Sequence, residues 1–294
     1  GVFDESRYFD VTVEYAKAGP EDVCVKIAAT NRGLDPAEIH LLPTAWCRNT
    51  WSWGGVGAAQ SRPILRRSPR DPHGFLVEHP ETGHFRLICG DAQIEGGKPG
   101  APTPAPPELL FTENDTNVEH LFGAVNPTPY VKDSINDAVV GGHLERVNPA
   151  QCGTKAAAHY RAVLDGGQTL VLRLRLLPVS DGSMRLASDA IAEVDGVVAQ
   201  RLAEADEFYA ELQPASLGED ERRVQRQAFA GMLWCKQYFH WDVDRWLRGD
   251  PGQPPPPAER TNGRNRDWRH FNSADVMSMP DSWEYPWFAA WDLA

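Results

Sequence analysis

The sequence predicts a segregated fold, in which an antiparallel β-sandwich over residues 1–180 precedes a helical region over residues 181–294. In the first part, apolar and polar residues alternate with a period of two, between frequent Gly and Pro turn signals. After Pro178 the apolar residues recur every three or four positions, which is the spacing of one helix face. A stretch of strands followed by a stretch of helices indicates separate layers or domains.

The strands are predicted from this alternation. Val11, Val13 and Tyr15 alternate with polar residues, and a turn signal at residues 18–20 separates them from a second alternating run at 23–29. Further candidate strands lie at 39–47, 62–68, 74–78, 84–90, 107–112, 156–164 and 169–177. In the last run four leucines, from Leu170 to Leu176, face one way and two arginines the other. About nine strands with loop-rich connections favour a large sandwich.

Two long antiparallel helices are predicted after the sandwich. An apolar stripe runs from Ile191 to Leu212, and Pro214 ends it. Ser216 with Glu219 resembles a capping box that begins a second helix, whose stripe continues over residues 224–246. Residues 249–257 are rich in Gly and Pro and predict a surface loop. Two such helices leave apolar faces uncovered, so we expect this region to pack on further structure.

Composition excludes several classes of function. The net charge of -12 provides no basic stripe for nucleic acid. No run of about 18 apolar residues indicates a membrane span, and no signal peptide is recognised. Five widely spaced cysteines, without zinc spacing, indicate free thiols and favour a reducing, cytoplasmic location. We expect no metal and no cofactor, because no phosphate-binding, dinucleotide-binding or zinc-protease motif occurs in the required context.

Aromatic residues concentrate in two stretches. Three of the ten tryptophans, Trp46, Trp51 and Trp53, lie within eight residues, and the other seven lie between 234 and 291. Tryptophan presents a flat apolar face and an N–H donor, which suits the face and the hydroxyls of a sugar ring. Residues 46–53 and 265–272 combine tryptophan with Arg, Asn, Asp and His in this way. The alternative is that these aromatics join the sandwich to the helical region.

Asp292 is the candidate catalytic residue. It lies beside Trp291 and close to Trp287, in an apolar segment of residues 284–294. Partial desolvation would raise the pKa of this carboxyl group, and a protonated carboxylic acid suits protonation of a glycosidic oxygen. The alternative is a helix N-cap, where the helix dipole would lower the pKa instead.

Other carboxylates are weaker candidates. Asp281 follows Pro280 and precedes Ser282, which is turn chemistry. Asp242 and Asp244 fall near the end of the predicted second helix. Asp133 and Asp137 lack the full spacing of a calcium loop.

The C-terminal third resembles glycoside hydrolase family 63, in particular its bacterial α-glucosidase-like members. The resemblance is carried by the stretches Met-Leu-Trp-Cys-Lys-Gln-Tyr at 232–238, Met-Pro-Asp-Ser-Trp-Glu-Tyr-Pro-Trp at 279–287 and Trp-Asp at 291–292. Residues 31–33 and 41–46 resemble such bacterial proteins as well. The resemblance implies a β-sandwich followed by an (α/α)6 barrel that cleaves α-glycosidic, and specifically α-glucosidic, bonds with inversion.

The resemblance also assigns roles to residues. It makes Asp292 the general acid and Trp287 and Trp291 walls of the sugar subsite, while Arg266, Trp268 and His270 become candidates for sugar hydroxyl contacts. Trp51 and Trp53 would reach over the barrel mouth from the sandwich. The family's general base lies far downstream, and no residue of this chain matches it. We therefore expect an incomplete barrel that packs on its own missing remainder, and no hydrolysis by this chain alone.

Two other readings remain open. In one, the sandwich is a non-catalytic carbohydrate-binding or interdomain module. In the other, the protein is a sandwich-plus-barrel glycoside phosphorylase, which uses inorganic phosphate in place of water. In the hydrolase reading the partner is an oligosaccharide or a small α-glycoside.

Overall fold

A computed structural model describes residues 3–53, 62–97, 103–179, 185–250 and 253–278. The chain divides into two compact units, residues 1–202 and residues 203–294, and each is described by itself. Within the described residues, no helix combines the length and the apolar character that a membrane crossing requires.

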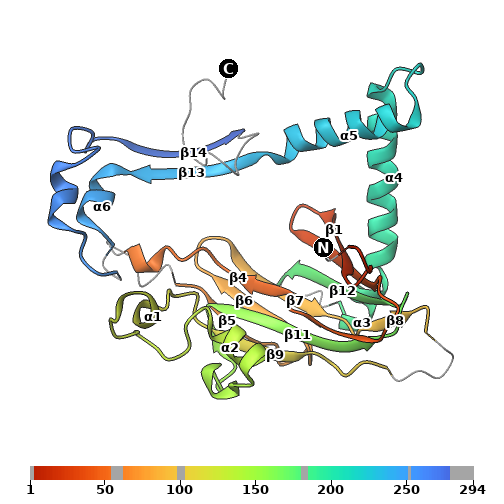
Figure 1. The fold of residues 1–294 in the computed structure, drawn as a ribbon, viewed down its shortest axis with the longest axis horizontal. Helices are drawn as coiled ribbons and strands as arrows, with labels where there is room; N and C mark the ends of the chain where they lie inside the picture. Colours follow the sequence, from red (N-terminus) through yellow and green to blue (C-terminus); the bar gives the residue numbers. More distant parts are fainter. Residues whose placement is uncertain (1–2, 54–61, 98–102, 180–184, 251–252, 279–294) are drawn as a thin grey trace. The chain divides into compact units, whose positions relative to one another are not determined.

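The first unit contains two antiparallel sheets (Figure 1). The larger sheet has the order β1 (Phe9–Gly19), β2 (Asp22–Asn31), β12 (Thr169–Pro178), β7 (Gly83–Cys89), β6 (Phe75–His79), β5 (Ile64–Arg67) and β10 (Cys152–Gly153), with β8 (Gln93–Glu95) also paired to β12. In the smaller sheet, β11 (Lys155–Leu164) pairs with β3 (Ala37–Leu41), β4 (Thr44–Trp46) and β9 (Glu108–Thr112).

The predicted strands are confirmed in most of their positions. β1 and β2 form the predicted hairpin, with Tyr15 opposite Val25. The predicted run at 39–47 divides into β3 and β4, because Pro43 cannot donate to a ladder and interrupts the strand. β8 and β10 were not predicted, since two or three residues are too few for a period to be seen.

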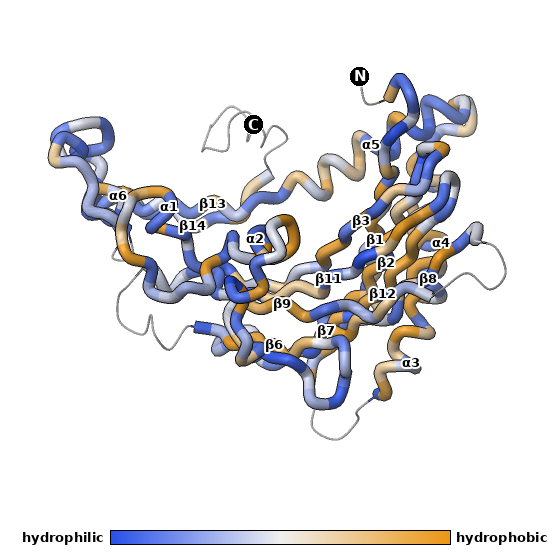
Figure 2. The backbone as a smooth tube through the Cα atoms, turned by 60° about the horizontal axis from the view of Figure 1, so that its bottom comes forward, coloured by the Kyte–Doolittle hydropathy of each residue, from blue (hydrophilic) through white to orange (hydrophobic). Residues whose placement is uncertain are grey.

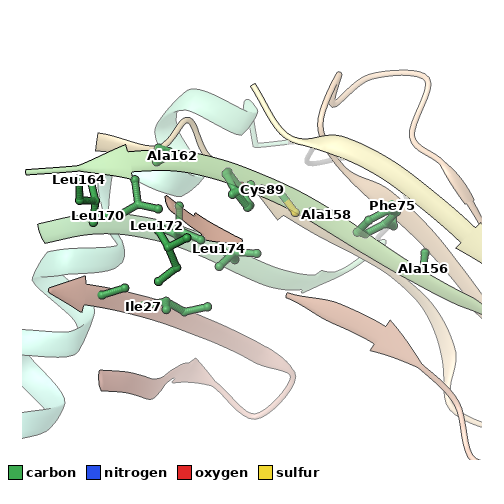
Figure 3. Packing of buried hydrophobic residues seen from close by; sticks show 14 of the residues in the cluster. Ile27, Phe75, Cys89, Ala156, Ala158, Ala162, Leu164, Leu170, Leu172 and Leu174 are labelled. Atoms are coloured by element: carbon green, nitrogen blue, oxygen red, sulfur yellow. The ribbon is translucent and has the colours of Figure 1, made fainter. Parts of the chain in front are cut away.

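The core lies between the two sheets, as in a β-sandwich. Leu170, Leu172 and Leu174 of β12 point from the larger sheet toward small residues of β11, among them Ala158 and Ala162 (Figure 3). All five are almost fully buried. The hydropathy colouring of β2 and β12 is correspondingly dominated by apolar residues (Figure 2). The apolar side of the predicted alternation thus supplies most of the free energy of folding of this unit.

Short helices flank the sandwich. They are α1 (Val118–Phe122), α2 (Ser134–Gly141), α3 (Ala187–Ala192) and the 3-10 turns η1 (Trp51–Trp53) and η2 (Leu144–Arg146). α2 covers the outer face of the smaller sheet, where Ile135 packs with Leu110 and Ala157. α3 packs on the outer face of the larger sheet, where Ala190 contacts Ile88.

The second unit contains helices and one hairpin. Its elements are the C-terminal part of α4 (Val194–Leu212), α5 (Glu219–Trp234), β13 (Lys236–Asp242), α6 (Val243–Arg248), the 3-10 turn η3 (Ala258–Asn262) and β14 (Asn272–Ser278). β13 and β14 pair antiparallel over their whole length, with Lys236 opposite Ser278 and Asp242 opposite Asn272.

The structure corrects the prediction of one continuous helix up to residue 246. The helix ends at Trp234, and residues 236–242 form a strand. Tyr238, Phe239 and Trp241 have aromatic side chains, which favour a strand once a partner strand is present. That partner, β14, lies some thirty residues further along the chain, so the local apolar period could not reveal it.

Two details of the predicted helices are also wrong. α5 begins after Gly218, whose N–H donates to Glu221 at 2.7 Å, instead of after Ser216. α5 has no buried residue, so it does not pack lengthwise on α4 as an antiparallel pair. Asp242, expected near the end of a long helix, is the N-cap of α6 and accepts the backbone N–H of Arg245 at 3.1 Å.

Candidate functional site

The candidate general acid lies outside the described residues. Asp292 and its neighbours Trp287 and Trp291 belong to residues 279–294, which follow β14 directly. Their assignment as acid and subsite walls therefore stays a prediction.

The predicted sugar-contacting residues lie together in the loop before β14. The rings of Trp268 and His270 stack with centroids 5.8 Å apart, and Trp268 is 57% exposed. The loop is held by its own backbone: Trp268 N–H donates to Asn265 O, and Phe271 N–H donates to Trp268 O, both at 2.9 Å. Arg266 is exposed beside Asp267, with Nε 3.4 Å from its carboxylate. The loop therefore presents an exposed tryptophan beside charged side chains.

A second aromatic group, which was not predicted from the sequence, lies at α6. The guanidinium of Arg260 lies over the Trp246 ring at 4.9 Å from its centroid, and its Nη1 donates to Trp246 O at 3.2 Å. Trp241 contacts Trp246, with ring centroids 5.7 Å apart. The apolar spacing assigned Trp246 to a helix stripe, whereas only its position beside η3 reveals the contact with Arg260.

The loop also contacts α6. Arg269 Nη1 lies 3.9 Å from Asp244, which pairs with Arg248 as well. Trp268, His270, Trp246 and their charged neighbours thus occupy one end of the β13–β14 hairpin. Ser278, after which the segment with Asp292 begins, is at the other end of β14. Six residue steps along a strand span about 20 Å.

Trp51 lies in the first unit, in a polar network around Asp115. Its Nε1 donates to Asp115 Oδ1 at 3.0 Å, and Asn49 donates to the same oxygen at 2.8 Å. Arg62 lies over the Trp51 ring at 5.7 Å and pairs with Glu113 at 2.8 Å. The indole N–H and one ring face are therefore already occupied within the unit. Trp53 lies in η1, and its side chain is not described.

The network anchors the loop that contains Trp51 to the end of β9. Asn114 donates to Cys47 O at 2.9 Å, and its backbone N–H donates to Thr154 Oγ1 at 2.7 Å. Thr154 in turn donates to Glu113 at 2.7 Å. Because each carboxylate accepts several hydrogen bonds, the network holds the loop in a fixed conformation.

Cys24 and Cys89 are buried, and burial raises the pKa of Cys89 to about 12, so this thiol stays protonated at neutral pH. Among the described residues, no group of three or more His, Cys, Asp or Glu side chains is placed to hold a metal ion. Asp137, considered as a calcium ligand, pairs instead with Arg146 at 3.5 Å.

An uncharacterized protein of Saccharomyces cerevisiae is 33% identical to this chain over an alignment of 309 residues. The alignment covers 99% of this chain and 28% of the yeast protein. The chain thus spans little more than a quarter of that relative's length. No family model matches the chain.

The structural neighbour is a protein from the human microbiome that is provisionally named a kojibiose phosphorylase. The two chains share 8% sequence identity and superpose with a TM-score of 0.26. The superposition covers 81% of this chain and 24% of the neighbour. A superposition of this quality carries no argument about fold or function.

Proposed function

We propose that this chain is the N-terminal part of an inverting glycoside hydrolase that cleaves α-glycosidic bonds, with α-glucosides as the preferred class. In this proposal a β-sandwich precedes an (α/α)6 barrel, and the enzyme acts in the cytoplasm. The assignment of the reaction rests on the resemblance of residues 230–292 to glycoside hydrolase family 63.

The observation that carries the proposal is the surface at one end of the β13–β14 hairpin. An exposed Trp268 stacked on His270 offers a platform for a sugar face, and Arg266 and Arg269 offer donors for hydroxyl groups. Platforms of this kind bind a sugar through apolar ring contact and fix its orientation through a few polar groups.

A second observation supports packing on further structure. Large apolar side chains of the second unit face solvent, including Leu233, Trp234 (83% exposed) and Val276. α5, which has no buried residue, would gain most from a partner domain. In the proposal this surface packs on the remainder of the barrel, which also supplies the general base.

Asp292 acts as the general acid in this mechanism. Trp287 and Trp291 exclude water from its carboxyl group and so keep it protonated, and it donates its proton to the leaving glycosidic oxygen. Inversion requires a second carboxylate roughly 6.5–9.5 Å away, with the attacking water between the two groups.

The test is hydrolysis of a panel of α-glucosides and α-mannosides by the full-length protein, its Asp292→Asn variant and the 294-residue chain. Asp281→Asn serves as a matched control, because Asp281 belongs to a predicted turn. We expect Asp292→Asn to lower kcat at least about a thousandfold, the control to retain activity, and the 294-residue chain to be inactive. Full activity of Asp292→Asn would refute the assignment of the acid, and turnover that depends on inorganic phosphate would refute hydrolysis.

A further inference from the structure

A groove lies on the outer face of the smaller sheet, and none of the residues proposed above to contact sugar lines it. Its volume is about 940 Å³. β3 and β11 form its floor and α2 its wall, and both views place α2 beside β11 (Figures 1 and 2). A volume of this size suits a small-molecule ligand.

Two lysines lie together at one end of the groove. Lys155 Nζ donates to the backbone oxygen of Lys132 at 2.8 Å, and Lys132 Nζ donates to Thr116 Oγ1 at 3.2 Å. In the part of the chain that the structure describes, neither ammonium group forms an ion pair, although the chain carries 41 acidic residues against 29 basic ones. These are two of only six lysines in the sequence.

This arrangement disfavours the charge on Lys155. Burial first, and the charge of Lys132 second, lower the pKa of Lys155, while Asp133 opposes both effects. Asp133 is the acidic group at this end of the groove, and its carboxylate accepts the amide of Asn117 at 2.9 Å. A bound anion would relieve the repulsion between the lysines and replace the hydration that Lys155 has lost.

The other end of the groove is already neutralised. Arg161 pairs with Glu38, and His40 Nε2 lies 3.7 Å from the same carboxylate. His40 Nδ1 also shares a hydrogen bond with His159 Nε2 at 2.8 Å. Arg161 lies six residues from Lys155 along β11, or about 20 Å. The two lysines are therefore the cations available to an anion, and they are too far from Arg161 to share it.

We propose that the groove binds a phosphorylated small molecule, with the phosphate held between Lys132 and Lys155. Each ammonium has three N–H donors and uses one on a protein oxygen, so two donors on each remain for the three terminal oxygens of a phosphate monoester. The neutral part of the ligand lies along Ile135, Val139 and Val140, which line the groove from α2.

Isothermal titration calorimetry with phenyl phosphate, inorganic phosphate and benzoate tests the proposal. We expect phenyl phosphate to bind more tightly than inorganic phosphate, because only phenyl phosphate reaches the apolar wall, and more tightly than benzoate. The assignment of a phosphate ligand is overturned if benzoate binds as well as phenyl phosphate does. The site itself is overturned if none of the three compounds binds at a concentration of about 10 mM, which is roughly the weak limit of useful affinity.

Titration of phenyl phosphate into four variants of the protein localises the site. Lys155→Gln and the exposed Lys132→Gln should each weaken binding about tenfold or more, as expected for loss of a charge-assisted hydrogen bond. Asp133→Asn should tighten it, because the competing carboxylate is removed. Lys17→Gln, the same substitution on β1, should leave affinity within about twofold. Equal affinity in all four variants would overturn the proposal.

Phosphate binding in the groove does not depend on the proposed hydrolase activity. None of the groove residues belongs to the proposed catalytic or sugar-contacting set, so failure of phosphate binding leaves the Asp292 experiment unaffected, and loss of the hydrolase assignment leaves the groove unaffected.

Discussion

Arg175 provides the sharpest test of how the sandwich is held to its flanking helix. Its side chain is 2% exposed and lies on the outer face of β12, opposite the buried leucines. Nε and Nη2 donate to the two carboxylate oxygens of Asp22 at 2.8 and 2.7 Å. Nη1 donates to Glu193 at 2.9 Å and to the backbone oxygen of Ala190 at 3.0 Å. One guanidinium thus ties β12 to β2 and to α3.

Arg175→Met keeps the aliphatic stem and removes all of these donors. Removal of one partner of a buried ion pair costs about 3–5 kcal/mol. The side chains of Asp22 and Glu193 are 23% and 47% exposed, so water reaches both carboxylates after the change. We therefore expect the lower end of that range, about 3 kcal/mol. With a urea m-value of about 2 kcal/mol/M, the unfolding midpoint should fall by about 1.5 M.

The assay is urea unfolding followed by circular dichroism, with thiol labelling of the buried Cys24 as a local probe of the same region. Arg173→Met on the same strand is the matched control, because Arg173 pairs with a single carboxylate, that of Asp195, and its loss should cost less than the loss of Arg175. An Arg175 variant that is destabilised no more than the Arg173 variant would contradict the stabilising role of the buried guanidinium.

Three further predictions concern the first unit. Hydrogen bonding from Arg173 lowers the pKa of Asp195 below its ordinary value of 3.8, so the ionised carboxylate stabilises the fold above that pH, and this contribution is lost as the pH falls through the folded-state pKa. We therefore expect the unfolding free energy, measured by urea titration from pH 7 to pH 2.5, to fall less in Arg173→Met than in the wild type. An identical pH profile would contradict this. Tyr160→Phe removes a buried hydrogen bond of 2.7 Å to Gly90 O, and should lower the unfolding free energy by about 1–2 kcal/mol without changing the fold; an unchanged urea midpoint would show that this bond adds nothing. Gly153→Ala would place a Cβ 2.3 Å from a backbone oxygen of β9, so the strand must shift. We expect the free energy of unfolding, followed by thermal unfolding, to fall by about 1–3 kcal/mol. A wild-type melting temperature would contradict the close approach.

The apolar alternation predicted much of the sandwich because its strands are largely buried on one side. Leu170, Leu172 and Leu174 face the core as predicted, and Arg175 lies on the opposite face. The burial of that arginine was not predictable from the two-residue period, because the helix that covers it, α3, lies beyond the sandwich in the sequence. α2 was not predicted although Ile135, Ala138 and Val139 have helical spacing, because a helix of 8 residues shows only two turns of that spacing.

The candidate site shows the same division. Local composition predicted Trp268 and His270 as sugar contacts, which stays a prediction, and the structure shows that their rings stack. Two other features depend on the hairpin, whose strands are distant in sequence. They are the contact of Arg260 with Trp246 and the separation of these groups from Ser278 along β14.

The sequence by itself determined where strands alternate and where helical spacing begins, because these properties depend on neighbours a few positions away. Only the tertiary structure decided that residues 236–242 are a strand, that the Trp51 indole donates to Asp115, and that Lys132 and Lys155 meet in one groove. Each of these results from contacts between segments far apart in the chain, whose free energy exceeds the local conformational preference.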